Sequence, residues 1–363
     1  MDTARPRENG RESSGRYNRT PMTGHLDIQT NFPLQAHNTF GIAARAGAYF
    51  PVADLEALRE FHRSGGLVNR PLLVLGGGSN ILFTQDFQGL VLHMRNTGIA
   101  IEKEDEQAVY VRAAAGENWH KFVLWTLQRG LGGLENLSLI PGTVGASPIQ
   151  NIGAYGVEVK DVLHSVTTFD LMSGEVRTLD NAACEFAYRD SIFKRALRDK
   201  AIIVDVCFAL PKQWQPNLRY AELAQEIAMR GIKKPCARDV SDAVISIRTR
   251  KLPDPAVIGN AGSFFKNPVV TVAQRDALLA RHPDLVSYPQ ADGSVKLAAG
   301  WLIDRCGWKG KSNGAAGVYE KQALVLVNRG GASGADIAQL ASAIQQDVAR
   351  QFDVKLEPEP VFV

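Results

Sequence analysis

Two glycine-rich stretches, residues 76–80 and 141–156, constrain most strongly what this chain can fold into. The first follows Pro71–Leu75, a short apolar run that predicts a buried strand. The second reads PGTVGASPIQNIGAYG and shows no helical or strand period. Successive glycines let backbone N–H groups converge without interference from a Cβ atom. An irregular stretch of this length inside a domain is usually functional.

Neither stretch matches an established phosphate-loop pattern. The Rossmann pattern requires G-x-G-x-x-G entering a helix, whereas the third residue after Gly78 is Ile81 and residues 81–83 predict extended chain. No Gly-Lys-Ser/Thr completes a Walker A loop. Either stretch alone also fits a tight structural turn. Two in one domain favour a cofactor, and the mixture of donors and flat apolar side chains suits a pyrophosphate at one end and a ring at the other.

Composition excludes several classes of protein. The chain has 363 residues, 45% hydrophobic and 22% charged, which predicts two or three domains rather than a disordered chain. The best apolar run, residues 201–210, is too short to cross a membrane. The net charge is +3, and five Arg against three acids in residues 1–24 supply most of it. No basic stripe of a nucleic-acid binder remains.

The four cysteines and seven histidines show no metal-ligand spacing. Without a C-x-x-C pair they predict neither a metal site nor a disulfide framework, but reduced thiols in a cytoplasmic protein.

Helices and strands alternate after a polar leader. We interpret residues 1–30 as a disordered leader and place a domain boundary at the breaker Leu252-Pro-Asp-Pro255. Gly259, Asn260 and Gly262 predict a loop around Ser263. Predicted helices cover residues 54–61, 117–129, 239–250, 271–281 and 296–306, and a long one begins at Ser333; predicted strands cover residues 71–75, 89–94, 109–114, 162–171, 201–210 and 323–328.

Eight short motifs in order make the sequence specific. They are NTFG at 38–41, GGGSN at 76–80, GENWH at 116–120, IPGTVG at 140–145, PIQNIGAYG at 148–156, YRDS at 188–191, GNAGSFFKNP at 259–268 and LEPE at 356–359. In these motifs the chain closely resembles the UDP-N-acetylenolpyruvoylglucosamine reductases (UDP-N-acetylmuramate dehydrogenases), flavoenzymes of peptidoglycan precursor synthesis. The resemblance covers residues 33–362. The segment WQPNLRY at 214–220 resembles the tyrosine loop of the larger of the family's two types.

The resemblance implies an α+β fold. A two-part FAD-binding domain of the vanillyl-alcohol-oxidase (PCMH) type would cover residues 36–250, with subdomains at about 36–100 and 101–250. A smaller α/β substrate-binding domain would cover residues 251–352, and residues 353–363 would return to the active site.

The resemblance also implies non-covalent FAD, NADPH as the hydride source, and a set of site residues. The implied catalytic residues are Arg189, Ser263 and Glu359. The implied substrate contacts are Tyr220, Lys251, Asn267 and Gln322. The implied cofactor contacts are Gly76, Gly77, Gly78, Ser79, Asn80, Gly142, Gly145, Ala146, Ser147, Ile152 and Gly153.

The residue types suit the implied chemistry, in which hydride adds to C3 of an enolpyruvyl ether and a proton to C2. Arg189 can face a carboxylate in a bidentate manner, although it could instead pair with Asp190. Glu359, between two prolines, would act best protonated if buried, but could be a solvated tail carboxylate. Ser263 would supply the proton, although a turn serine would look the same.

The substrate contacts have alternatives too, and two positions depart from the family. Lys251 could hold a pyrophosphate or lie on a solvated helix face, and Tyr220 could cover the nucleotide sugar or simply end a strand. Pro360-Val-Phe-Val replaces the Val-Arg-Phe of many relatives, and Ala146 stands where relatives carry Ser.

The sequence therefore predicts a monomeric, cytoplasmic NADPH-dependent flavin reductase acting on a UDP-sugar, with no nucleic-acid partner and no membrane span. An oxidase that passes electrons to oxygen and a catalytically inactive FAD- or UDP-sugar-binding protein are the alternatives.

Overall fold

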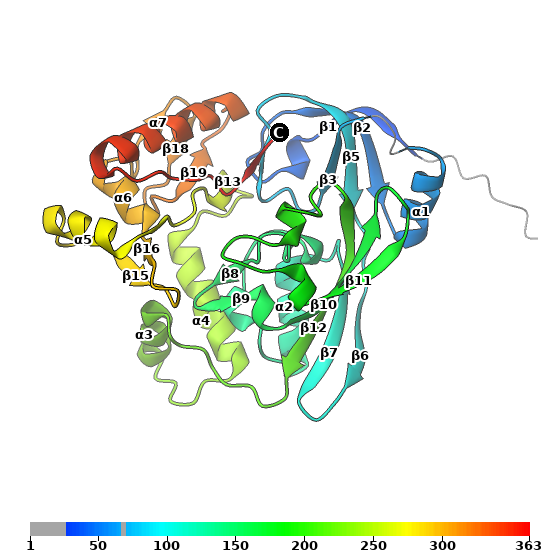
Figure 1. Cartoon of the computed structure of the whole chain (residues 1–363), viewed down its shortest axis with the longest axis horizontal. Helices are drawn as coiled ribbons and strands as arrows, with labels where there is room; N and C mark the ends of the chain where they lie inside the picture. The colour runs from blue at the N-terminus through cyan, green and yellow to red at the C-terminus, as the bar shows by residue number, and fades with distance from the viewer. Residues whose placement is uncertain (1–26, 67–69) are drawn as a thin grey trace, which may run out of the picture.

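The computed structural model describes residues 27–66 and 70–363, which form three larger sheets with helices packed around them (Figure 1). The first sheet has the order β1-β2-β5-β3, in which β2, β5 and β3 are parallel and β1 is antiparallel to β2. Its elements are β1 (Gln29–Pro33), β2 (Arg45–Val52), α1 (Leu55–Arg63), β3 (Leu72–Leu75) and β5 (Phe87–Met94). The Asp54 carboxylate caps α1 by accepting from the Ala57 amide at 2.7 Å.

The second sheet is antiparallel and carries the order β11-β10-β12-β7-β6. Its elements are β6 (Ile99–Glu104), β7 (Ala108–Ala114), α2 (Trp119–Gln128), β10 (Leu163–Asp170), β11 (Val176–Asp180) and β12 (Ala201–Pro211). Helix α2 packs on this sheet through Trp119 and Phe122, whose rings contact Phe208 of β12 at centroid distances of 5.9 and 5.0 Å. These buried rings form the centre of one hydrophobic core.

The third sheet, β13-β19-β18-β17, lies in the C-terminal part beside a three-stranded sheet, β14-β16-β15. Their elements are β13 (Gly259–Ser263), β14 (Val269–Val270), α5 (Val272–Arg281), β15 (Ser287–Pro289), β16 (Val295–Leu297), α6 (Ala299–Arg305), β17 (Ser312–Asn313), β18 (Ala316–Val318), β19 (Val325–Asn328) and α7 (Gly334–Phe352). The predicted start of the long helix at Ser333 is confirmed, because Ser333 and Asp336 exchange hydrogen bonds in a capping box at the start of α7.

The glycine-rich segment between α2 and β10 has little regular structure. It contains three 3₁₀ turns and one two-stranded ribbon: η2 (Glu135–Leu137), η3 (Val144–Ala146), η4 (Val159–Asp161), β8 (Gly153–Ala154) and β9 (Val157–Glu158). Buried Asn151 holds it together, donating to Glu158 at 3.0 Å and to the Ala187 carbonyl at 3.1 Å. In this segment, side-chain hydrogen bonds thus take the place of the backbone hydrogen bonds of a sheet.

The C-terminal segment returns to the residues that follow the first glycine-rich stretch. Strand β20 (Val361–Phe362) pairs in parallel with β4 (Ile81–Leu82), directly after the first glycine-rich stretch (Figure 1). One hydrophobic core joins Leu34 and Phe40 of the first sheet region to Phe264 and Phe352 of the C-terminal part. Packing therefore couples the first sheet region to the C-terminal part.

Three sequence predictions need correction. Residues 296–306 do not form one helix, because Lys296 and Leu297 belong to β16 and α6 begins only at Ala299. The loop predicted around Ser263 is strand β13, although its pairing with β19 is irregular between Asn260 and Ser263. The leader does not extend to residue 30, because β1 begins at Gln29; residues 1–26 of that prediction lie outside the described residues.

The sequence did not predict helix α3 (Ala221–Met229). The helix predicted at 239–250 is α4, which is slightly longer (Ala237–Lys251). Among the described helices, none is long and apolar enough to cross a membrane.

Candidate active site

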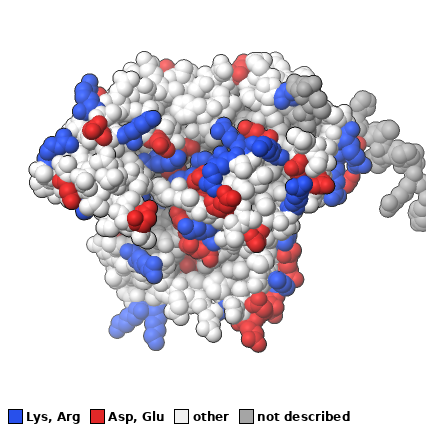
Figure 2. Space-filling model, viewed as in Figure 1, with Lys and Arg blue, Asp and Glu red and all other residues white. Residues whose placement is uncertain are grey.

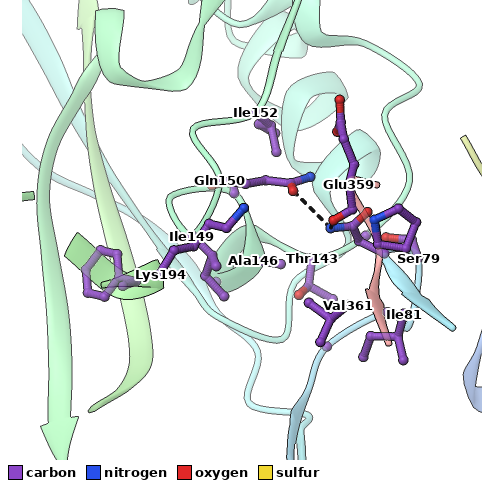
Figure 3. Close-up of a pocket in the computed structure, with 18 of the residues that line it drawn as sticks. Ser79, Ile81, Thr143, Ala146, Ile149, Gln150, Ile152, Lys194, Glu359 and Val361 are labelled. Carbon is purple, nitrogen blue, oxygen red and sulfur yellow. Dashed lines mark hydrogen bonds between the residues drawn. The ribbon is translucent and has the colours of Figure 1, made fainter. Parts of the chain in front are cut away.

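A pocket of about 680 Å³ lies where the first sheet, the glycine-rich segment and the C-terminal part meet. Its volume is within the usual range for a cofactor site. All predicted site residues except Tyr220, Lys251 and Gln322 line it. In Figure 3, Ser79, Ile81, Glu359 and Val361 lie on one side of the pocket and Lys194 on the opposite side. Lys and Arg side chains gather across the centre of the face in Figure 2.

The two glycine-rich stretches pack directly against each other at the pocket wall. A Cβ on Gly76 would lie 2.4 Å from the Thr143 hydroxyl oxygen, and one on Gly77 would lie 3.0 Å from the Cα of Gly142. The Ser79 hydroxyl donates to the Pro141 carbonyl at 3.1 Å. This close approach explains why both stretches need glycine, and it makes them one structural unit.

The backbone amides of the first stretch fit an anionic cofactor. Within residues 27–66 and 70–363, the N–H groups of Gly77, Gly78 and Ser79 donate to no backbone carbonyl. Gly78 has φ +61°, and a Cβ there would lie 2.0 Å from the His37 carbonyl oxygen. Unpaired amides turned together by a left-handed glycine form an anion-binding nest, as the diphosphate of FAD requires.

Arg248 lines the pocket, although no sequence motif singled it out. It comes from α4, and its Nε is buried without a hydrogen-bond partner among the described residues. Burial lowers the pKa of Arg248, while the neighbouring Tyr155 opposes that shift. A buried cation with an unused donor suits a ligand that brings an acceptor. The helical spacing of Arg248 from buried Val244 was the available signal.

Arg189 occupies the tip of a tight turn and points at Glu359. Ala187 and Asp190 pair across the turn, and Arg189 itself has φ +54°, a conformation that costs a non-glycine residue about 1–2 kcal/mol. Its guanidinium donates to the Gly153 carbonyl at 2.9 Å and lies 3.5 Å from the Glu359 carboxylate. Asp190 pairs with Arg195 instead. Strain of this kind is typical of functional residues.

Glu359 is enclosed although only four residues follow it in the sequence. Its amide donates to the Phe264 carbonyl at 2.8 Å, which attaches the segment to the end of β13. The carboxylate side chain is 12% exposed. Burial raises the pKa of Glu359, although Arg189, Lys194 and Lys266 pull it down. A protonated carboxyl that can donate is therefore available at higher pH than for an ordinary glutamate.

Ser263 and Asn267 enter the pocket from the C-terminal part. Ser263 ends β13 just after Gly262, whose φ of +70° accompanies the irregular pairing with β19. The Asn267 side-chain oxygen accepts from the Ala299 amide at 2.9 Å in the first turn of α6. This bond occupies the acceptor of Asn267 and orients its NH₂ group as the remaining donor.

The three residues that do not line the pocket lie on neighbouring elements. Tyr220 precedes α3, and its ring packs edge-on against Tyr155 at 5.2 Å. Lys251 ends α4 and pairs with Glu222 at 2.6 Å. Gln322 accepts from the Leu324 amide at 3.3 Å, in the turn before β19. The pairing with Glu222 uses one of the three N–H donors of Lys251.

Residues missed by the sequence analysis anchor the Tyr220 segment. Glu135 is buried; its carboxylate accepts from the Gly133 amide at 2.6 Å and from the Trp214 indole at 2.9 Å. Asn136 donates to the carbonyls of Tyr155 and Asn217. These pairs join η2 to a segment about 80 residues later, which no local sequence signal indicates.

Comparison with known proteins matches both parts of the chain. The family described as UDP-N-acetylenolpyruvoylglucosamine reductase, C-terminal domain, matches residues 254–363, and the family described as FAD binding domain matches residues 48–180. The chain is 58% identical to UDP-N-acetylenolpyruvoylglucosamine reductase of Burkholderia cenocepacia over 343 residues, which cover 94% of this chain and 98% of that protein. It is also 58% identical to the Burkholderia lata enzyme, over 93% of this chain and 97% of that one.

A solved structure shares the fold. The UDP-N-acetylenolpyruvylglucosamine reductase of Thermus caldophilus superposes with a TM-score of 0.62 at 23% sequence identity, covering 93% of this chain and 98% of that one. Together with the match to the FAD binding domain, this likeness confirms the predicted fold class of an FAD-binding part followed by a smaller C-terminal part.

Proposed function

The chain belongs to the UDP-N-acetylenolpyruvoylglucosamine reductase family, and from that premise we propose how its residues carry out the reaction. The protein is an FAD-containing, NADPH-dependent oxidoreductase that reduces UDP-N-acetylglucosamine enolpyruvate to UDP-N-acetylmuramate in peptidoglycan precursor synthesis. The observation that supports the residue roles is the single pocket where Arg189, Ser263 and Glu359 meet two glycine-rich stretches.

The glycine-rich stretches would hold FAD. The amides of Gly77, Gly78 and Ser79 would face its diphosphate, while Ile152 and Gly153 would lie along its apolar ring. The buried Arg248 would face the polar edge of that ring or the anionic end of the substrate. When bound, FAD allows two-electron transfer from NADPH to the substrate in two separate half-reactions.

The catalytic residues would stabilise charge and deliver a proton. As hydride reaches C3 of the enolpyruvyl group, electron density moves onto C2 and the adjacent carboxylate. Arg189 would pair with that carboxylate, and protonated Glu359 would donate a hydrogen bond to the same developing charge. Ser263 would give its hydroxyl proton to C2 and regain one from solvent. Proton and hydride together balance the reduction.

The substrate contacts would act at the mouth of the pocket. Lys251 would exchange Glu222 for a pyrophosphate, and Tyr220 would cover the nucleotide sugar from its anchored segment. Asn267 would donate from its NH₂ group, and Gln322 would contact the substrate from the turn before β19. We also propose that the protein acts as a monomer in the cytoplasm, because Arg189, Ser263 and Glu359 share one pocket within a single chain. Light scattering on the purified protein tests the monomer.

Two half-reactions test the proposed function. We expect the purified protein to be yellow, to bleach with NADPH under anaerobic conditions and to recover its colour on addition of the enolpyruvyl substrate. Recovery with oxygen alone, and none with the substrate, would instead indicate an oxidase. A colourless protein that takes up no FAD would contradict the proposal.

A further inference from the structure

We propose that Lys194 is a positioning residue for catalysis, because its ammonium holds the backbone of Arg189 in the left-handed conformation that aims the guanidinium at Glu359. The inference rests on the proposed function, since it assigns a role in the same pocket. Lys194 belongs to the 3₁₀ turn η6 (Ile192–Lys194), which directly follows the Arg189 turn. Nothing in the sequence motifs had singled it out.

The first observation is the hydrogen bond from Lys194. Its Nζ donates to the Arg189 carbonyl oxygen at 3.1 Å. Arg189 is a non-glycine residue at φ +54°, so an ordinary chain would relax out of this conformation. The bonds between Ala187 and Asp190 close the turn on either side of Arg189, and Lys194 alone among described side chains bonds the Arg189 carbonyl. A backbone held this way keeps the guanidinium in one direction.

The second observation is the place of the side chain. Lys194 lines the pocket and extends toward Ile149 and Gln150 (Figure 3). Ser191, the N-cap residue of the same turn, donates to the Ile149 carbonyl at 2.6 Å. Hydrogen bonds thus attach turn η6 both to the Arg189 turn and to the glycine-rich segment. The Arg189 turn is therefore held at a fixed place relative to that segment.

The third observation is electrostatic. It separates the effect of Lys194 on the charge of Glu359 from its effect on the backbone of Arg189. The charges facing Glu359 are Arg189, Lys194 and Lys266, each of which lowers its pKa, and the titratable Tyr188. Lys266 pairs with Glu357 at 3.2 Å and has no hydrogen bond to Arg189. Lys194 and Lys266 therefore share an effect on the charge of Glu359, whereas only Lys194 holds the Arg189 backbone.

The experiment compares Lys194→Met, Lys194→Arg and Lys266→Met in the FAD-loaded protein. Anaerobic stopped-flow absorbance measures flavin reduction by NADPH and reoxidation by the substrate between pH 6 and 9. Substrate titrations of the oxidised protein give Kd. Both Met variants should move the pH dependence of reoxidation upward, because each removes a cation that lowers the pKa of Glu359. Lys194→Met should also lower the plateau rate about 10²-fold, the usual effect of a small misplacement.

Rescue and selectivity complete the test. Lys194→Arg should regain most of the plateau rate, because a guanidinium keeps both charge and donor, and NADPH reduction should stay at the wild-type rate in every variant. The proposal is overturned if Lys194→Met reoxidises at the wild-type plateau, matches Lys266→Met, or slows both half-reactions equally. If wild-type protein fails to reoxidise with the substrate, the proposed function itself fails, independently of the variants.

Discussion

Asn80, in the first glycine-rich stretch, donates from its side-chain amide to the backbone carbonyl of Glu359 at 3.2 Å, across 279 residues of sequence. The same NH₂ group donates to Gln150 at 2.9 Å, the bond drawn as a dashed line in Figure 3. The Asn80 carbonyl in turn accepts from the Val361 amide at 2.9 Å. One side chain thus connects the predicted cofactor loop, the second glycine-rich stretch and the acid of the active site.

Asn80→Ala should weaken both FAD retention and substrate reduction. The variant leaves two acceptors without their shared donor, which costs about 1–3 kcal/mol when they are buried. We expect about a tenfold slower reoxidation of flavin by the substrate and faster loss of FAD on dilution, measured by stopped-flow absorbance and released-flavin fluorescence. Thr84→Val is the control, since it removes only the hydroxyl bond to the Val363 carbonyl, beyond the active site. Equal losses in both variants would contradict a specific role for Asn80.

Ser263→Ala should separate the two half-reactions. The hydroxyl would be needed only when a proton is delivered to C2, so NADPH should still bleach the flavin at the wild-type rate. Reoxidation by the substrate should slow about 10²–10⁴-fold, the usual effect of losing a positioned acid. Rapid-mixing absorbance measures both rates. Equal slowing of the two half-reactions would exclude Ser263 as the proton donor.

Substrate reduction should fall as pH rises through the pKa of Glu359. Burial raises this pKa, so the carboxyl keeps its proton above the usual range for glutamate, and the donating form disappears only at higher pH. Glu359→Gln retains a donor without a titration, so it should flatten this limb of the pH profile at a lower rate. If the rate in Glu359→Gln still falls with rising pH as in the wild type, another group causes this fall.

Glu359→Gln should also change how the stability of the folded protein depends on pH. Because the folded protein binds the Glu359 proton more tightly than the unfolded chain, the wild type loses stability as pH rises from the ordinary glutamate pKa through the raised one. Glu359→Gln does not suffer this loss. Its Tm relative to wild type should therefore increase with pH across that window, as thermal unfolding at several pH values can measure.

Trp214→Phe should loosen the segment that carries Tyr220. The substitution keeps an aromatic ring beside Gly132 but removes the indole donor, which leaves the buried Glu135 carboxylate with one hydrogen bond fewer. We expect a loss of about 1–3 kcal/mol in unfolding free energy and a raised KM for the UDP-sugar. Denaturant unfolding and steady-state kinetics measure the two effects. Trp125→Phe, on α2, is the control for replacing a tryptophan; an equal rise in KM there would contradict the anchor.

Gly78→Ala should abolish FAD binding. A Cβ at this position would lie 2.0 Å from the His37 carbonyl oxygen, and φ is +61°, so the loop must change shape. Gly130→Ala is the matched control: its φ is +73°, but nothing lies within 4 Å of its Cβ, so it should cost only the backbone strain of about 1–2 kcal/mol. The flavin-to-protein absorbance ratio after gel filtration decides. Full FAD content in Gly78→Ala would refute the assignment of this loop.

Local features of the fold were predictable because their causes lie within a few residues. The apolar residues at helical spacing predicted α1, and the N-cap residue Ser333 predicted the start of α7. The prediction for 296–306 was wrong because Lys296 pairs with Val269 of β14 and Leu297 pairs with Ser287 of β15, which holds both residues in strand β16. Pairing partners of this kind are not visible in a single segment.

For the active site, the amino-acid sequence by itself determined the chemistry available: glycines that free backbone amides, an arginine, a serine and a glutamate in recognisable motifs. Only the tertiary structure decided that Arg189 lies 3.5 Å from Glu359 and that Glu359 is buried. It also revealed Arg248 and Glu135, whose surroundings include residues remote in sequence, and Lys194, whose ammonium reaches the Arg189 carbonyl only in the folded turn. Backbone preferences are local properties of a residue, whereas burial, charge proximity and the resulting pKa arise only when distant segments pack together.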